Sequence, residues 1–144
     1  PFIGVGIENL SNPLADFKKS LLKVRDLPVE MVLPAHGKPF TGLRTRVDQL
    51  LHHHEERASE ILDALNCDPL SVYQIAGKVP WMKDLGARPF SELRLLDKRL
   101  AMMETAAHLA MLAGENKAVM IHNDNMLTWT AAGCRKRPGA GEWK

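Results

Sequence analysis

The sequence is poor in cysteine, and the two that it has, Cys67 and Cys134, are too few for a disulfide framework. They also lack the close pairing of cysteines that structural zinc sites use. A structural zinc site is therefore not expected. Two isolated cysteines suit a reducing compartment, so we expect both to be free thiols and the chain to be cytoplasmic.

Long apolar runs are absent as well. No stretch approaches the ~20 consecutive apolar residues that a membrane-spanning helix needs, and no basic segment precedes an apolar one as in a signal peptide. Charge of one sign does not predominate, because the formal net charge is +2 with 25% charged residues. We therefore expect neither a membrane partner nor an overall field that attracts polyanions such as nucleic acid.

The composition does provide for a core. The chain has 144 residues, of which 45% are hydrophobic, which matches one ordinary folded domain. It begins with Pro1-Phe2-Ile3 and no methionine. From this we expect a processed product or an excised piece of a longer protein.

An apolar run stops abruptly in the segment VLPAHGKPF, residues 32–40. Val32 and Leu33 are typical of the end of a buried strand, and Pro34 lacks the donor that further pairing would need. His36 is then placed where a strand gives way to a loop. In α/β proteins, side chains at that location converge on ligands, because the sheet holds the loops beyond its strand ends. The segment alone leaves open that His36 is only a turn residue.

The N-terminal part predicts a helix followed by a strand. Asn12 caps a helix with Pro13 at its first position, where the missing N–H has no intrahelical partner. This helix ends before Pro28, and a strand follows at 31–33. The opening residues 2–5 are typical of a strand end.

Periodicity predicts three further helices. Apolar residues recur at spacings of three and four over 44–65, which indicates a long amphipathic helix. Ser71 and Gln74 form a capping box for a short second helix. A third helical stretch runs over 89–113 and ends at Gly114 as its C-cap. The residues that we expect to face inward in it are Leu93, Leu96, Leu100, Met103, Ala107 and Met111.

Two short apolar runs, 118–121 and 126–129, flank the polar tip Asn123-Asp124-Asn125 and predict a β-hairpin. Three helices followed by a hairpin is the order of a winged helix. The tail from Cys134 onward carries Arg135-Lys136-Arg137 and is expected to be loose.

Three local patterns follow one another: PLADFKKSL before VLPAHG, then R-x-x-x-L-L-H-H-H-E-E-R, then ETAAHLAMLAGENKAV with a hairpin that ends at Trp129. In that order, from Pro13 to Trp129, they resemble the C-terminal part of metallo-β-lactamase-fold hydrolases that carry an appended winged-helix domain. The resemblance implies a mostly helical α+β fold. Its parts would be the terminal strand and helix elements of a lactamase-type αββα domain over 1–42, a long helix plus winged-helix domain over 43–133, and a flexible basic tail over 134–144.

The resemblance also implies a role for one histidine. In such hydrolases the histidine of the LPAHG-like segment is the last ligand of a two-metal site, so His36 inherits that position. The main ligand cluster, H-x-H-x-D-H, lies upstream in these proteins and is absent here, because His52-His53-His54-Glu55 does not fit it. A hydrolytic centre needs about three protein ligands per metal. We therefore expect zinc or another divalent metal in the full-length parent, and an inactive segment without stoichiometric metal.

Four further residues are candidates for substrate or interdomain contacts. Gly37 lets the loop turn directly after His36. Arg46, His53 and Arg57 share one stripe of the long helix, and the resemblance places an Arg, a His and an Arg at these positions. An arginine on this stripe would clamp a carboxylate or a phosphate. A solvated helix face is the alternative.

The other histidines favour structural roles. Adjacent helical side chains point about 100° apart, so His52, His53 and His54 cannot share one ion, and His54 falls within the apolar stripe as a core residue. Glu104 and His108 lie four residues apart, as a proton-shuttling pair would. We favour instead a hydrogen bond that ties this helix to the hairpin. Trp81 and Trp129 are expected in the core or at a hinge.

Together these patterns predict the C-terminal segment of a metal-dependent hydrolase of an ester, thioester or phosphodiester. Its partners would be the upstream lactamase-fold domain of the same chain and the parent's small-molecule substrate. The alternative is a winged-helix interaction module for homodimerisation or non-specific nucleic-acid contact. Sequence-specific DNA reading is not expected, because residues 101–113 contain no Lys or Arg.

Overall fold

The computed structural model describes residues 12–82, 86–123 and 126–134. The predicted strand end at 2–5, the hairpin tip at 124–125 and the basic tail at 135–144 lie outside these residues. The fold is mostly helical α+β, with a two-stranded antiparallel sheet. Its elements are α1 (Pro13–Val24), α2 (Leu43–Ala64), α3 (Val72–Ala76), the 3₁₀ turn η2 (Phe90–Glu92), α4 (Leu95–Gly114), β1 (Ala118–Asn123) and β2 (Met126–Ala131).

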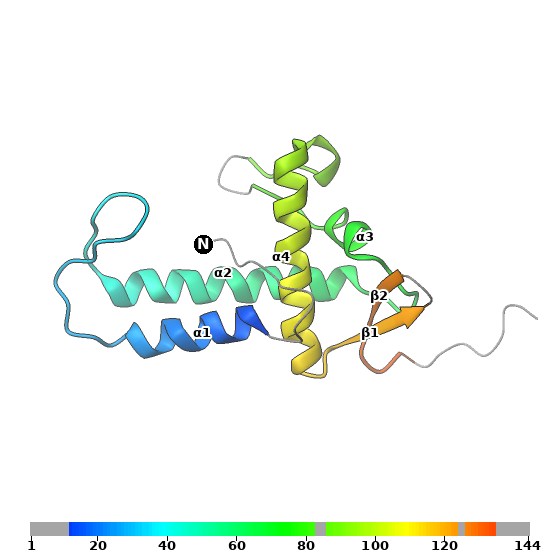
Figure 1. The fold of residues 1–144 in the computed structure, drawn as a ribbon, viewed down its shortest axis with the longest axis horizontal. Helices are drawn as coiled ribbons and strands as arrows, with labels where there is room; N and C mark the ends of the chain where they lie inside the picture. The colour runs from blue at the N-terminus through cyan, green and yellow to red at the C-terminus, as the bar shows by residue number, and fades with distance from the viewer. Residues whose placement is uncertain (1–11, 83–85, 124–125, 135–144) are drawn as a thin grey trace, which may run out of the picture.

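The helices make two groups around α4. Helices α1 and α2 lie side by side and antiparallel, α4 crosses both, and α3 and the hairpin lie near the C-terminal end of α2 (Figure 1). Among the helices that the structure describes, none combines the length and apolar character that a membrane crossing requires.

Helix α1 begins as predicted. The Asn12 side chain accepts a hydrogen bond from the Ala15 N–H at 3.1 Å, with Pro13 at the first helical position. Asn12 Nδ2 also donates to the Ala110 carbonyl of α4 at 3.4 Å. A Cβ on Gly114 would lie 3.1 Å from this Nδ2, so the small residue there lets the two helices approach. One side chain thus caps α1 and ties it to α4.

The predicted strand at 31–33 is wrong. The structure has only a single antiparallel bridge here, with Val32 and Phe40 exchanging hydrogen bonds of 2.8 and 3.1 Å. Met31 and Leu33 are 60% and 77% exposed, so the expected burial is absent too. A strand becomes stable when neighbouring strands pair with it and its apolar face is covered. The described residues provide neither at this place.

The main core lies where α2, α3, α4 and the hairpin meet. Trp81 and Trp129 belong to it with 5% and 7% exposure, which confirms them as core residues. A smaller cluster joins α1 to α4 and is formed by Leu14, Ala107 and Met111. Helix α1 is therefore held by far less buried apolar surface than the elements of the main core.

The third predicted helix is shorter than expected, and its inward face is confirmed in part, because Leu93, Ala107 and Met111 are buried. Its first residues form the 3₁₀ turn η2, and α4 begins only at Leu95. Leu96 and Leu100 were expected to face inward but are 65% and 36% exposed, whereas Thr105 and His108 are fully buried. Phe90 and Leu93, both buried, anchor the residues before the helix in the core, whereas the first turns of α4 carry Leu96 and Leu100 in solvent.

Gly114 is the last residue of α4 and not its C-cap as predicted; Glu115 is the C-cap, and Asn116 takes the left-handed position after it. Its φ of 58° lies in the left-handed region that asparagine tolerates. The Asn116 N–H bonds to the Ala113 carbonyl at 3.0 Å, and the Lys117 N–H bonds to the Leu112 carbonyl at 2.8 Å. These two bonds make a Schellman motif, which satisfies carbonyls at the helix end.

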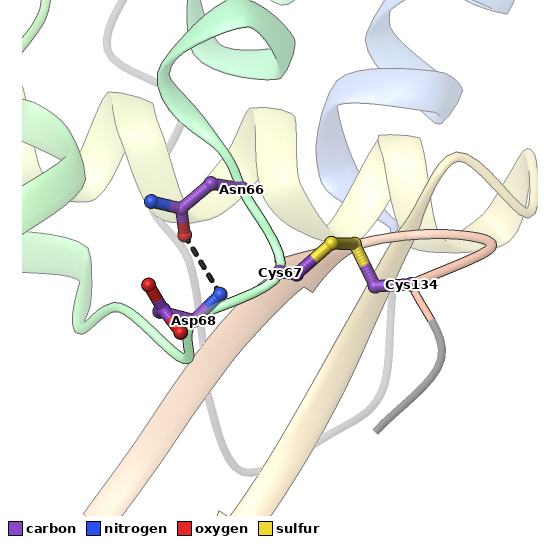
Figure 2. The surroundings of a disulfide bond; sticks show 4 residues. All are labelled: Asn66, Cys67, Asp68 and Cys134. Carbon is purple, nitrogen blue, oxygen red and sulfur yellow. Dashed lines mark hydrogen bonds between the residues drawn. A yellow bond between two sulfur atoms is a disulfide. The ribbon is translucent and has the colours of Figure 1, made fainter. Parts of the chain in front are cut away.

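Cys67 and Cys134 form a disulfide, so the expectation of two free thiols was wrong (Figure 2). Their Cα atoms lie 5.1 Å apart, although 67 positions separate them in the sequence. The fold brings them together because the segment after α2 pairs with β2 through a bridge between Leu70 and Trp129. The cysteine-based argument for a reducing cytosol therefore no longer holds.

The capping box of α3 is confirmed and offers a first prediction. The Ser71 Oγ accepts from the Gln74 N–H, and the Gln74 side chain accepts from the Ser71 N–H at 2.9 Å. We expect Ser71→Ala to lower the free energy of unfolding by about 1 kcal/mol, because it leaves a helix donor without its partner. Denaturant unfolding measures this. Ser59→Ala, at an exposed position of α2, is the control and should lose nothing; an equal effect of both would contradict the prediction.

Candidate functional site

His36 lies in an exposed turn enclosed by the Val32–Phe40 bridge. Gly37 follows with a φ of 93°, in the region that favours glycine, and a Cβ there would meet nothing within 4 Å. Glycine is therefore required at this position by backbone conformation and not by crowding. Gly42, with a φ of 77°, then leads the chain into α2. The turn thus holds an imidazole in solvent ahead of the long helix.

The residues around His36 do not form a metal site by themselves. Across the described ranges, no three His, Cys, Asp or Glu side chains converge as ligands. A hydrolytic metal centre needs about three protein donors for each metal and an open position for water. The donor set of the described residues therefore does not fit a resident metal. Further ligands for a metal at His36 would have to come from residues outside the described ranges.

The structure divides the predicted stripe of Arg46, His53 and Arg57. Arg46 and His53 are exposed, and the Arg46 side chain donates to Gln49 at 3.3 Å on its own helix. Arg57 is only 5% exposed. The three residues therefore do not present one continuous face to solvent, and Arg57 needs a separate account.

Arg57 is the centre of a buried polar network. Its Nε donates to Glu104 of α4 at 3.2 Å, and its Nη1 donates to Glu60 at 2.8 Å and to the Pro80 carbonyl at 2.7 Å. Its guanidinium carbon lies 4.4 Å from the centre of the Trp81 ring, within the range of a cation–π contact. The guanidinium thus joins α2 to α4 and to the segment after α3.

Glu104 was predicted as a partner of His108, but its carboxylate pairs with Arg57. The sequence did not predict this pairing, because the two residues lie on different helices and no local pattern indicates where those helices cross. The only signal in the sequence was the presence of a basic residue on the long helix and an acidic residue on the third predicted helix.

The prediction that His54 is a core residue is confirmed, and His108 was missed as its neighbour. The two are 4% and 0% exposed, and His54 Nδ1 lies 3.4 Å from His108 Nε2. His108 Nδ1 lies 2.8 Å from the carbonyl oxygen of Glu104. His108 therefore binds the backbone of its own helix and a side chain of α2, not the hairpin as expected.

The hydrogen bonds decide which nitrogen of each ring carries the proton. A carbonyl oxygen only accepts, so His108 Nδ1 is the donor towards Glu104 and the neutral ring accepts at Nε2. His54 Nδ1 must then donate to His108. The lone pair of His54 Nε2 is buried and finds no hydrogen-bond partner within the described residues.

Burial keeps both rings neutral. It lowers the pKa of His54 to about 4, together with electrostatic repulsion from His108, His53 and Lys18. Burial also lowers the pKa of His108, although the bond to the Glu104 carbonyl and the Glu104 charge oppose it. These are structural histidines at neutral pH, and nothing among the described residues around them activates them as acids or bases.

No protein-family profile matches the chain. It is 26% identical over 105 residues, 73% of its length, to the "Probable metallo-hydrolase YqjP" of Bacillus subtilis (strain 168). It spans 30% of the length of that protein.

Two solved structures share the fold of this chain. A beta-lactamase domain protein from Burkholderia ambifaria matches 90% of it at 33% identity with a TM-score of 0.73, and the chain covers 36% of that protein. A metallo-beta-lactamase family protein from Thermus thermophilus matches 91% of it at 25% identity with a TM-score of 0.68, and the chain covers 37% of that protein. The chain thus spans about a third of the length of each relative, and together they point to a metallo-β-lactamase-fold protein.

Proposed function

We propose that this chain is the C-terminal segment of a longer, metal-dependent hydrolase that cleaves an ester, a thioester or a phosphodiester. The observation that carries the proposal is the likeness of nearly the whole chain to about a third of metallo-β-lactamase-fold proteins. The name of the Bacillus relative, a probable metallo-hydrolase, supports hydrolysis that uses a divalent metal. The substrate class rests on the resemblance of the sequence motifs alone.

Within that parent, His36 is proposed as one ligand of zinc or another divalent metal. Its exposed position in a turn shaped by Gly37 supports this, because a ligand must face the other donors and not the core of its own segment. A neutral imidazole is a common ligand for such metals. The remaining donors would belong to the upstream part of the parent.

The upstream lactamase-fold domain is the proposed partner of the first segment, residues 1–42. From the last turn of α1 to the start of the His36 turn, six apolar side chains are exposed: Leu22, Val24, Leu27, Val29, Met31 and Leu33. Six exposed apolar residues within such a short segment are typical of a covered surface and not of a free one. Residues 43–133 would then form the domain that covers or flanks the active site, and the order of α3, α4 and the hairpin supports a winged helix there.

A substitution at His36 in the full-length parent tests the proposal. We expect His36→Ala to lower kcat/KM by at least about 100-fold and to reduce the bound metal, because it removes a ligand. Hydrolysis of an aryl ester, a thioester and an aryl phosphodiester would be measured beside metal content. His122→Ala, at an exposed histidine of β1, is the matched control and should change neither.

Unchanged activity and metal content in His36→Ala would refute the role of His36. The chain of 144 residues should by itself show no hydrolysis and no stoichiometric metal. Hydrolysis by this chain alone would show that the catalytic groups do not lie upstream.

A further inference from the structure

Three helices meet at the buried histidine pair. His54 belongs to α2 and His108 to α4, and the rings of His54 and of Phe17 in α1 make a T-shaped contact with 5.8 Å between ring centres. The small apolar cluster of Leu14, Ala107 and Met111, which holds α1 to α4, has Phe17 packed against it. The pair therefore lies at the place where α1 is attached to the rest of the chain.

A proton added to this pair finds no acceptor among the described residues. The free lone pair is that of His54 Nε2, which is buried and unpartnered. Protonation there would create a buried N–H without a hydrogen bond and a charge in an apolar site, both of which are unfavourable. The closed arrangement of α1, α2 and α4 therefore excludes the imidazolium form.

The charged groups around the pair act in the same direction, with one exception. Lys18 on α1 and His53 on α2 disfavour the charge on His54, and Arg57 disfavours it on His108. Glu104 on α4 favours it. The carboxylate of Glu104 is bound to Arg57, and this bond weakens its ability to stabilise an imidazolium.

We propose that the His54–His108 pair is a pH-sensitive joint, at which acidification below about pH 6 releases α1 from α2 and α4 while the main core stays folded. Release brings His54 into water, where the imidazole takes up a proton freely. The proposal is independent of any metal at His36.

The direction of the effect follows from proton linkage. A histidine whose pKa is about 4 in the closed state and about 6.5 in the open state stabilises the closed state fully above pH 6.5. That stabilisation is lost as the pH falls from 6.5 towards 4. Between about pH 7.5 and pH 5, His54 alone raises the opening equilibrium about 30-fold.

The ion pair between Arg25 and Asp48, which also links α1 to α2, does not contribute to the expected pH dependence of α1 opening. Arg25 at the end of α1 donates to Asp48 of α2 at 2.6 Å. The hydrogen bond from Arg25 lowers the pKa of the Asp48 carboxyl below its usual 3.8. Asp48 therefore keeps its charge at pH 5, and this pair keeps its strength while the histidines respond.

Amide hydrogen exchange of the 144-residue chain, followed by mass spectrometry, tests the proposal. After correction for the intrinsic pH dependence of exchange, we expect the protection of α1 amides to fall about 30-fold from pH 7.5 to pH 5, with α3 and the hairpin unchanged. His122→Gln, at an exposed histidine of β1, should keep this response. The double variant His54→Gln/His108→Gln should lose the pH response, because the side-chain amides of glutamine can form hydrogen bonds but cannot titrate.

A measurement on the unsubstituted chain keeps the test decisive if the double variant does not fold. Proton NMR should show the His54 ring titrating well below 6.5, because protonation of this buried ring requires the opening of α1. Titration of His54 near 6.5 would overturn the proposal. So would α1 protection that does not change with pH, or a loss of protection that is equal in α1 and in the main core.

Discussion

Reduction of the Cys67–Cys134 disulfide is expected to lower the free energy of unfolding of this chain by about 4 kcal/mol. The bond closes a loop whose ends are 67 positions apart, and this loop contains α3, η2, α4 and the hairpin. In the chain-entropy account, the bond acts by restricting the unfolded chain, and the effect grows with the logarithm of loop length. The folded chain holds the same two ends together through the Leu70–Trp129 bridge, so it loses little on reduction.

Denaturant unfolding with and without a dithiol reductant measures this loss as a shift in midpoint. The double variant Cys67→Ser/Cys134→Ser should unfold at the lower midpoint in both conditions, which separates the bond from any other effect of the reductant. Equal midpoints for the oxidised and reduced chain would contradict the prediction. Alkylation of both thiols in the native chain without reductant would show that the bond does not form.

Replacement of Arg57 by methionine is expected to lower the free energy of unfolding by about 3 kcal/mol. The side chain keeps similar length, but the Pro80 carbonyl and the Glu104 carboxylate lose their donor, and Trp81 loses its cation. This loss in free energy of unfolding is smaller than for a fully buried ion pair, because the Glu104 side chain is 35% exposed and water screens part of its interaction with Arg57.

Arg46→Met is the matched control for this substitution. It removes an arginine from an exposed position of the same helix and should change stability by less than about 0.5 kcal/mol. Arg57→Lys should recover only part of the loss, because an ammonium keeps the charge but lacks the planar fork of donors that binds several groups at once. Equal stability of Arg57→Met and Arg46→Met would refute the structural role.

The same variant separates two roles of Arg57 in the full-length parent. If Arg57 only joins helices, Arg57→Met lowers activity in proportion to the folded fraction and leaves KM unchanged. If it also binds an anionic substrate, KM rises in the folded enzyme. The internal bonds of Arg57 lead us to expect the first outcome.

Local patterns predicted those features whose interactions span a few residues. The Asn12 cap, the long helix over 44–65, the Ser71–Gln74 box and the hairpin all appear in the structure close to where they were expected. Each of them depends on hydrogen bonds or side-chain spacing within one or two helical turns or across one tight turn. The sequence alone contains that information.

The predictions that failed involve partners distant in the chain. The strand at 31–33 needed neighbouring strands, and the burial of Leu96 and Leu100 needed neighbours that do not cover the first turns of α4 in the described residues. The same holds for features that the sequence did not suggest, namely the disulfide, the contact of Arg57 with Glu104 and the pairing of His54 with His108.

The sequence by itself thus determined where α1, α2 and α3 begin, which residues are apolar enough for a core, and which histidine lies in a glycine turn. Only the tertiary structure decided that Arg57 is buried, that two histidines share one hydrogen bond and that two cysteines meet. The reason is physical: a charge, a ring or a thiol acquires its partner from the crossing of α2 with α4 and from the docking of the hairpin. Those arrangements depend on the packing of the whole chain.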